Sequence, residues 1–330
     1  MGEGNSVTNL KIGIIGAGDI GTTHGNILQK NINVTLGSVY DMDQERSEEF
    51  ASRFGMEILA SVEEVIADSD AVYITVPNKF HAELTLKVLD EGKHVFCEKP
   101  FALSISDAEN ILNSAEKAGV VYQLGFNRRL APAYKKMKDL ITEGDLIPRS
   151  FNIKMNRGEL QIPPWISDSK LTGGFLFEST LHLIDIVCYL FGDVDRITAV
   201  GTKSVYLCVD DFSMLFEMKN GCHGVFSSSA HSTWVFPFER VEIYGDHISI
   251  FNDEMETVTY CVGLNTPVEK QDFSTFPIEE RWGYTQEDQV FVNRILGLDS
   301  DNNNLVATHI DGYKNVEIIE SIYDQIELGR

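Results

Sequence analysis

Three glycines near the N-terminus are spaced for binding a phosphate group. Gly16, Gly18 and Gly21 follow an apolar run, residues 12–15, and open a helix-like segment. Glycines at this spacing permit a tight exit from a strand, a close approach of backbone amides to a pyrophosphate, and close packing of the helix on the sheet. The unpaired amides at the helix N-terminus, on Asp19 and Ile20, favour an anion there. The pattern predicts a dinucleotide site.

Asp41 extends this prediction to the adenosine ribose. It ends a second strand-like run, residues 34–40, and lies 20 residues beyond Gly21, a spacing at which an acid reaches the ribose hydroxyls. A carboxylate at this place repels a 2′-phosphate, so NAD is favoured and NADP is the alternative. The competing interpretation is that Asp41 caps the next helix, a role for which Asp43 is an equally good candidate.

Lys99 is a candidate for catalysis. It ends an apolar strand, and Pro100 prevents that strand from continuing. An ammonium at a strand end can hold a substrate hydroxyl and stabilise the alkoxide that forms before hydride leaves carbon. The alternative is a solvated loop lysine that pairs with Glu98.

A helix-like segment, residues 177–191, carries three ionisable groups. Glu178, His182 and Asp185 are four and three residues apart, a spacing that predicts one shared helix face. Burying them is costly unless they line a polar cavity. A histidine between two carboxylates suits a general base, with Glu178 orienting His182. The alternative is a core histidine that its neighbours merely fix, and Asp185 could be purely structural.

Composition excludes several classes of partner. The net charge is −23, with 27 basic and 50 acidic residues, so nucleic acid and anionic membranes are unsuitable partners. Five cysteines lie apart with no CxxC pair, and no histidine pairing suggests a metal, so we expect neither a disulfide frame nor a metal site. Apolar runs are too short for a membrane span, and residues 1–9 resemble a loose tail rather than a signal peptide, which indicates a cytoplasmic protein.

Strand and helix patterns alternate up to residue 125. This alternation predicts an α/β unit over residues 10–125, a doubly wound parallel Rossmann sheet. Four motifs follow predicted strands and should meet at one edge of that sheet: residues 16–21, 77–78, 98–100 and 125–127.

Residues 126–330 change to runs of strands between helices. The predicted strands are 151–155, 197–206, 212–218, 224–230, 239–244 and 248–251, and the predicted helices are 131–141, 177–191, 287–296 and 312–327. They indicate an α+β domain with an open, mainly antiparallel sheet. Because helices cover only one face of such a sheet, we expect a second copy of the chain to cover the other, in a homodimer or homotetramer.

These motifs together resemble the glucose-fructose oxidoreductase, inositol dehydrogenase and rhizopine-catabolism family over nearly the whole chain. The resemblance rests on the glycine loop, Thr75-Val76-Pro77-Asn78 with His81, Glu98-Lys99-Pro100, and Gly173-Gly174 leading to the histidine helix. It implies a two-domain, NAD(P)-dependent enzyme that oxidises or reduces a carbinol of a sugar, inositol or sugar nucleotide.

The resemblance also implies roles for individual residues. Lys99 and His182 would be catalytic, Lys99-Pro100 a cis peptide, and Val76, Pro77, Asn78, His81 and Glu98 part of the cofactor site. Many members carry Asp at the position of Glu178, and other branches carry Glu.

Residues 125–129 and 156–158, with Trp165, resemble a branch associated with polysaccharide and sugar-nucleotide assembly. Asn127, Arg128, Arg157, Trp165 and Asp185 are therefore candidates for binding substrate. Trp165 would stack on a sugar face and an arginine would meet an acidic or phosphorylated group; surface packing is the alternative for each.

Two other functions remain open from the sequence. One is an NAD-dependent glycosidase or epimerase that oxidises its substrate only transiently. The other is a non-catalytic sensor that binds dinucleotide and a protein partner.

Overall fold

The chain folds into two compact units. The computed structural model describes residues 9–144, 146–160, 162–234, 238–298 and 305–328, so the expected tail lies outside the description except for Asn9. The first unit comprises the chain up to Ala102, Ser106–Gly125 and Tyr284–Tyr313, and the second comprises Leu103–Ile105, Phe126–Gly283 and the chain from Lys314. Residues 284–313, which the sequence placed in the second domain, thus pack with the first unit.

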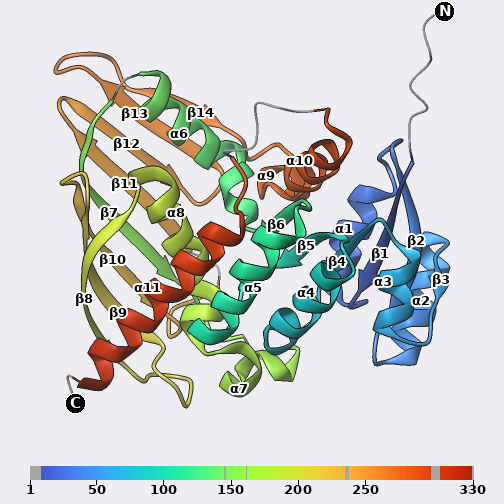
Figure 1. Ribbon diagram of the computed structural model, residues 1–330. Helices are drawn as coiled ribbons and strands as arrows, with labels where there is room; N and C mark the ends of the chain where they lie inside the picture. The colour runs from blue at the N-terminus through green and yellow to red at the C-terminus, as the bar shows by residue number, and fades with distance from the viewer. Residues whose placement is uncertain (1–8, 145, 161, 235–237, 299–304, 329–330) are drawn as a thin grey trace, which may run out of the picture. The chain divides into compact units, whose positions relative to one another are not determined.

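The first unit contains the predicted parallel sheet. Its six strands have the order β3-β2-β1-β4-β5-β6, and every neighbouring pair is parallel. This order is that of the dinucleotide-binding Rossmann fold, so the predicted fold class is confirmed. The strands are β1 (Leu10–Ile15), β2 (Val34–Tyr40), β3 (Glu57–Ile58), β4 (Ala71–Ile74), β5 (His94–Glu98) and β6 (Tyr122–Gly125) (Figure 1).

Helices cover both faces of this sheet because its strands are apolar on both sides. The helices that follow these strands are α1 (Asp19–Leu28), α2 (Gln44–Phe54), α3 (Val62–Asp68), α4 (His81–Asp90) and α5 (Ile105–Ala118). The ends of α2 and α3 carry residues typical of helix caps: Asp43 caps α2, Gly55 ends it in a left-handed conformation, and Ser61 caps α3.

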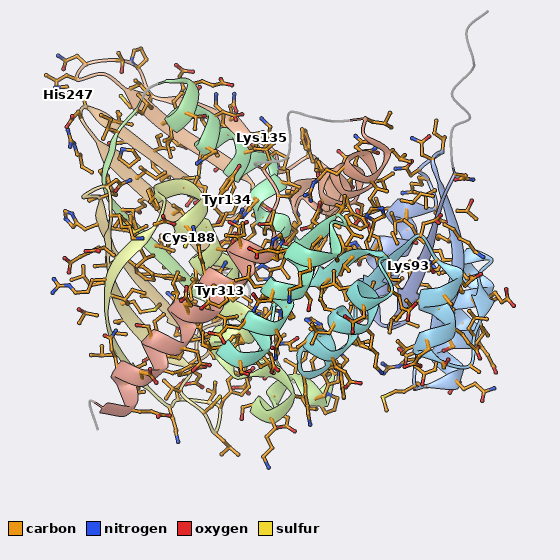
Figure 2. All side chains as sticks on the ribbon, in the orientation of Figure 1. Lys93, Tyr134, Lys135, Cys188, His247 and Tyr313 are labelled. Carbon is orange, nitrogen blue, oxygen red and sulfur yellow. The ribbon has the colours of Figure 1, made fainter. Side chains whose placement is uncertain are left out.

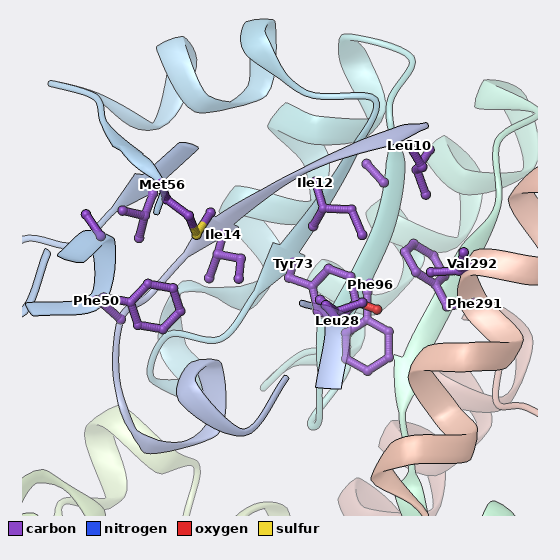
Figure 3. Close-up of a cluster of buried hydrophobic side chains, with 14 residues drawn as sticks. Leu10, Ile12, Ile14, Leu28, Phe50, Met56, Tyr73, Phe96, Phe291 and Val292 are labelled. Atoms are coloured by element: carbon purple, nitrogen blue, oxygen red, sulfur yellow. The ribbon is translucent and has the colours of Figure 1, made fainter. Parts of the chain in front are cut away.

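A helix from far along the chain completes the core of the first unit. α10 (Tyr284–Leu296) inserts Phe291, which is fully buried. Its ring centroid lies 5.4 Å from that of Tyr73 and 5.6 Å from that of Phe96. The same cluster contains Leu28 and Phe50, so α1, α2 and α10 share one face of the sheet (Figure 3).

The second unit is built on an open sheet of eight strands. Their order is β14-β13-β12-β11-β7-β10-β9-β8, and all pairs are antiparallel except β7 with β10. The predicted α+β class is confirmed, although β13 and β14 were not predicted. The strands are β7 (Pro148–Asn156), β8 (Val194–Thr202), β9 (Asp211–Met218), β10 (His223–Ser229), β11 (Glu239–Gly245), β12 (Ile248–Asp253), β13 (Thr257–Val262) and β14 (Glu269–Asp272).

Three helices, α6 (Pro132–Glu143), α8 (Leu181–Phe191) and α11 (His309–Leu328), accompany this sheet (Figure 1). Side chains of β7 alternate, with Phe151, Ile153 and Met155 buried and Asn152 exposed. The opposite face exposes scattered apolar groups among polar ones: Val200, Leu215, Val225 and Tyr244. That a second copy covers this face stays a prediction.

Two kinds of feature are absent from the residues that the structure describes. No helix among them combines the length and apolar character needed to cross a bilayer. No group of three or more His, Cys, Asp or Glu side chains within the described ranges is arranged to hold a metal ion.

The packing of α10 is testable by mutation. Phe291→Ala should lower the free energy of unfolding by about 3–5 kcal/mol, because it leaves a cavity against Tyr73 and Phe96. Leu298→Ala, at a side chain 64% exposed, is the matched control and should change it by less than about 0.5 kcal/mol. Urea titration followed by fluorescence measures both. Equal effects of the two variants would show that α10 does not belong to this core.

Candidate active site

The glycine loop between β1 and α1 forms the predicted cradle. Gly16 has a φ of +106°, and a Cβ there would lie 2.6 Å from the carbonyl oxygen of Thr75. A Cβ on Gly21 would lie 2.4 Å from the carbonyl oxygen of Gly16. A Cβ on Gly18 would meet no described atom within 4 Å, so the backbone of this residue faces open space. A pyrophosphate can therefore approach the loop at Gly18.

The start of α1 adds amide donors to the cradle. Gly18 is the N-cap, and no described side chain caps this end of the helix. The first amides of an α-helix have no carbonyl partner within the helix, and the helix dipole adds partial positive charge. The amides of Asp19, Ile20 and Gly21 can therefore bind an anion, and this donor set fits a dinucleotide.

Asp41 is fastened beside this loop. Its Oδ2 accepts a hydrogen bond from the Ala17 amide at 2.8 Å, and its Oδ1 accepts one from the Asp43 amide at 2.9 Å. Asp43, in turn, accepts from the Glu45 and Arg46 amides and caps α2. Of the two interpretations given by the sequence, the capping role belongs to Asp43. Asp41 is left partly exposed at the cradle, where it suits a ribose diol.

The predicted strand-end motifs lie on one edge of the sheet. β1, β4, β5 and β6 are consecutive neighbours and parallel, so their carboxyl ends meet at the same edge. The glycine loop, Val76-Pro77-Asn78 and Glu98-Lys99-Pro100 all follow these ends. In an open α/β sheet this edge is where ligands bind.

His81 shapes this edge. It is 1% exposed, its Nδ1 lies 2.8 Å from the Pro100 carbonyl oxygen, and its Nε2 lies 2.8 Å from the Val76 carbonyl oxygen. Burial lowers its pKa more than these two contacts raise it. Because both ring nitrogens contact the backbone, the side chain joins the loops after β4 and β5. That His81 contacts the cofactor stays a prediction.

A buried cluster of charges fixes the end of β5. His24, on α1, is fully buried, with Nδ1 2.8 Å from Asp288 Oδ1 and Nε2 3.2 Å from Glu98 Oε1. Tyr73 also donates to Asp288 Oδ1, at 3.1 Å. Burial alone lowers the pKa of His24, but the charge of Asp288 and hydrogen bonds to Asp288 and Glu98 outweigh it and raise the pKa to about 10. His24 is therefore an imidazolium near neutral pH.

Glu98 connects His24 to the main chain of Lys99. Its Oε2 accepts a hydrogen bond from the Lys99 amide at 3.1 Å, while its Oε1 contacts His24. The Lys99-Pro100 peptide is cis, as the resemblance implied. The Lys99 side chain is partly exposed. The main chain of the candidate catalytic lysine is thus held by a carboxylate that is itself bound to a buried cation.

In the second unit the histidine helix begins differently from the prediction. Residues Leu176–Thr180 form a π-helical segment, η4, and the α-helix α8 begins at Leu181. A π turn is wider than an α turn and often marks functional sites. Glu178 therefore lies in the π segment and not in the α-helix that carries His182 and Asp185, and that the three side chains share one face stays a prediction.

Asp185 belongs to a buried ion pair. It is fully buried, and Arg129 donates to its two oxygens, from Nε at 2.7 Å and from Nη2 at 2.6 Å. Asn315, on α11, donates to it at 3.1 Å. These contacts join α8 to η2 (Asn127–Leu130) and to α11. They give Asp185 the structural role that the sequence left open. His182 is 9% exposed and lies edge-on to Phe126, with 6.2 Å between ring centroids.

Glu178 pairs with Arg157, the residue that directly follows β7. Its Oε2 accepts from Arg157 Nη2 at 2.5 Å and also from the Ser179 hydroxyl. The Arg157 and Glu178 side chains are 8% and 15% exposed. The sequence suggested that Arg157 binds an anionic group of the substrate. In the structure its guanidinium is bound to the Glu178 carboxylate. That Glu178 orients His182 stays a prediction.

Three other predicted substrate residues are placed as follows. Arg128 is 2% exposed and donates to Glu239 Oε2 from Nε at 2.9 Å and Nη2 at 2.8 Å. Tyr134, which Figure 2 labels, lies on α6 and donates to the other oxygen of Glu239, at 2.8 Å. Asn127 is buried and donates to the Trp282 carbonyl oxygen at 2.9 Å. Trp165 lies in η3 (Pro164–Ser167) and is partly buried.

The sequence reasoning missed two groups of residues. The His24 cluster was overlooked, although a histidine three residues after Gly21 on an otherwise apolar helix face was a usable signal. Trp234 and Trp282, two of the three tryptophans, were not considered. Trp234 lines a pocket of about 550 Å³ in the second unit.

Comparisons with known proteins identify the family of both units. Residues 10–126 match a family model described as an oxidoreductase family with an NAD-binding Rossmann fold, and residues 134–251 match the GFO/IDH/MocA C-terminal domain.

Among characterised relatives, the chain is 27% identical to myo-inositol 2-dehydrogenase of Thermotoga maritima over 87% of this chain and 88% of that protein. It is 35% identical to glucose-6-phosphate 3-dehydrogenase of Bacillus subtilis over 64% of this chain and 65% of that protein. A levoglucosan dehydrogenase solved with NADH and levoglucosan has the same fold, with a TM-score of 0.87, 20% identity and 98% of each chain covered.

The His24 cluster predicts a decline of stability with rising pH. Its stabilisation is fully present below the unfolded histidine pKa of 6.5 and is lost as pH rises through about 10. In between, the folded state holds a proton that the unfolded state has released, so the free energy of unfolding should fall by about 1.4 kcal/mol per pH unit from this group.

A neutral double variant, His24→Gln with Asp288→Asn, isolates this contribution. Urea titrations of both proteins over the same pH series should give a shallower decline for the variant, since other titrating groups are shared. Parallel declines would show that His24 is uncharged in the folded protein.

Proposed function

Because the chain belongs to the GFO/IDH/MocA family of oxidoreductases, we propose that it is an NAD-dependent dehydrogenase acting on a carbinol of a sugar or polyol. The observation that carries this proposal is the position of Lys99, directly after Glu98 on the same sheet edge as the glycine cradle. The relatives that act on inositol, glucose 6-phosphate and levoglucosan support the substrate class.

The residues that would hold the coenzyme are those of the first unit. The amides of Gly18 to Gly21 would bind the pyrophosphate, and Asp41 would bind the adenosine ribose. The loops of Val76, Pro77 and Asn78 would border the remainder of the nucleotide. Bound NAD supplies a nicotinamide ring that accepts the hydride from carbon.

Two side chains would manage the substrate proton. The Lys99 ammonium stabilises the alkoxide that develops as the hydroxyl is deprotonated. His182 takes the hydroxyl proton as general base, a role that its imidazole can perform near neutral pH. Glu178, held by Arg157, is a positioning residue for the helix segment that carries His182. In the reverse direction His182 returns the proton to the carbonyl oxygen.

Removing either group should abolish turnover. Lys99→Met and His182→Asn should each lower kcat by about 10²–10⁴, the usual contribution of a positioned acid or base. NAD affinity, measured by calorimetry, should change little, because the cradle is intact. The assay is NADH absorbance with a panel of sugars and polyols. Full activity in both variants would refute the assignment.

The preference for NAD over NADP should depend on Asp41. Asp41→Ser combined with Met42→Arg removes the repulsion of a 2′-phosphate and adds a cation beside it. The ratio of kcat/KM for NAD over NADP should fall at least about tenfold, which corresponds to about 1.4 kcal/mol. Asp43→Asn, at the cap of α2, is the control and should leave the ratio unchanged. An unaltered ratio in the double variant would show that Asp41 does not face the ribose.

A further inference from the structure

Three aromatic side chains of the second unit form a row that the proposed mechanism does not use. The ring centroids of Trp234 and Phe238 are 6.5 Å apart with an interplanar angle of 27°, and those of Phe238 and Trp282 are 6.4 Å apart at 21°. Trp234 is 48% exposed, and the other two rings are partly exposed. We call this row the aromatic ladder. The three rings present apolar surface and carry no charge themselves.

An arginine stands at each end of the aromatic ladder. Arg157 Cζ lies 5.1 Å from the Trp234 ring centroid, and Arg128 Cζ lies 5.6 Å from that of Trp282. Both guanidiniums are buried and bound to carboxylates, Arg157 to Glu178 and Arg128 to Glu239. The charge of each guanidinium is thus already matched by a carboxylate of the protein, so neither arginine offers a substrate phosphate an uncompensated cation.

The pocket beside Trp234 is large enough for a sugar and has no cationic lining. Its volume of about 550 Å³ lies within the usual range for small-molecule sites. No lysine or arginine occurs among the described residues that line it. Its apolar side chains include Ile162, Val205 and Trp234, and its polar ones are Glu159, His231 and Ser232.

The walls of this pocket are preformed. Trp234 Nε1 donates to the Glu159 carbonyl oxygen at 3.1 Å, and a Cβ on Gly158 would lie 2.6 Å from Trp234 Cδ1, so the indole lies directly on the backbone. Asp210, fully buried, accepts from the amides of Val205 and Tyr206 at 2.9 and 2.7 Å. It thereby fixes the loop that supplies Val205.

The pocket is also linked to the histidine helix. The Ser232 amide donates to the Arg157 carbonyl oxygen at 2.9 Å, and Arg157 binds Glu178 on η4. η4 continues directly into α8, which carries His182. A ligand in the pocket is therefore bound by segments that are tied to the candidate general base.

We propose, on the basis of the dehydrogenase function above, that this pocket binds an uncharged carbohydrate against Trp234 of the aromatic ladder, and that it discriminates against sugar phosphates and nucleotide sugars. An apolar ring face of the sugar packs on the indole, and its hydroxyls bond to Glu159, His231 and Ser232. Phosphorylation of the same sugar adds negative charge to a pocket whose described lining includes the Glu159 side chain and no lysine or arginine.

Matched pairs of ligands test this proposal. We would assay NAD reduction by the intact protein with three pairs of ligands. They are glucose with glucose 6-phosphate, myo-inositol with a myo-inositol monophosphate, and N-acetylglucosamine with its UDP conjugate. Binding to the NADH-loaded protein is measured in parallel by calorimetry, which does not depend on turnover. The neutral member of a bound pair should bind at least tenfold more tightly.

Substitution of the indole tests the location. Trp234→Ala should raise KM or Kd for the neutral ligand at least tenfold and change kcat less than KM. Phe276→Ala, at an aromatic side chain 41% exposed outside the aromatic ladder, is the control and should change neither. Ser232→Lys should narrow the difference between neutral and phosphorylated ligands.

The outcomes separate this inference from the proposed function. Tighter binding and faster turnover of a phosphorylated or nucleotide-linked member would overturn the inference and leave the dehydrogenase function standing. Preferential binding of neutral sugars with no turnover of any would support the inference and defeat the function. An unchanged affinity in Trp234→Ala, or binding of neither member of any pair, would overturn the inference.

Discussion

The buried imidazolium of His24 is the interaction on which the nucleotide-binding edge depends. It lies between carboxylates from two elements that are far apart in sequence, Asp288 on α10 and Glu98 at the end of β5. A buried cation of this kind is stable only when its charge is matched. These ion pairs hold α1, β5 and α10 together. They lie close in sequence to both the glycine loop, which precedes α1, and Lys99, which follows β5. The geometry of the cradle and that of the lysine are therefore set by one cluster.

In the second unit, buried arginines are likewise matched by carboxylates. Three ion pairs each join separate elements around the histidine helix. They are Arg129 with Asp185, Arg128 with Glu239, and Arg157 with Glu178. Removing one member of such a pair costs more than the pair contributes, because the other charge is left buried. These pairs explain why a chain can place so many ionisable groups beside an apolar helix.

Much of the fold was predictable from local patterns. The strand before the glycine loop, the cap at Asp43 and the alternation of strands and helices each depend on neighbours in sequence, and each was confirmed. α10 was predicted as a helix but not as part of the first unit, since its place depends on Phe291 packing against strands that lie about 200 residues earlier. β14 contains no apolar residue, so no pattern marked it as a strand.

The site was less predictable than the fold, because its chemistry depends on pairing. The sequence identified Arg128, Arg157 and Asp185 as chemically active types, but it could not show that each has a buried partner from a distant strand or helix. The π segment at Leu176–Thr180 likewise leaves no signature in the spacing of Glu178 and His182. Residue types indicated where charge lies, and only the three-dimensional structure showed which charges are already matched.

Charge matching also explains how an acidic protein can bind an anionic coenzyme and favour a neutral substrate. With a net charge of −23, the protein opposes any anion that depends on long-range attraction. The nucleotide site avoids this by using backbone amides at the start of α1, whose partial charges do not depend on side-chain cations. The pocket beside Trp234 has an aromatic wall and a carboxylate, and the nearby guanidiniums are bound to carboxylates of the protein. Phosphate is thus favoured where backbone amides are available at the start of α1 and disfavoured in the pocket beside Trp234, whose described lining contains a carboxylate and no lysine or arginine.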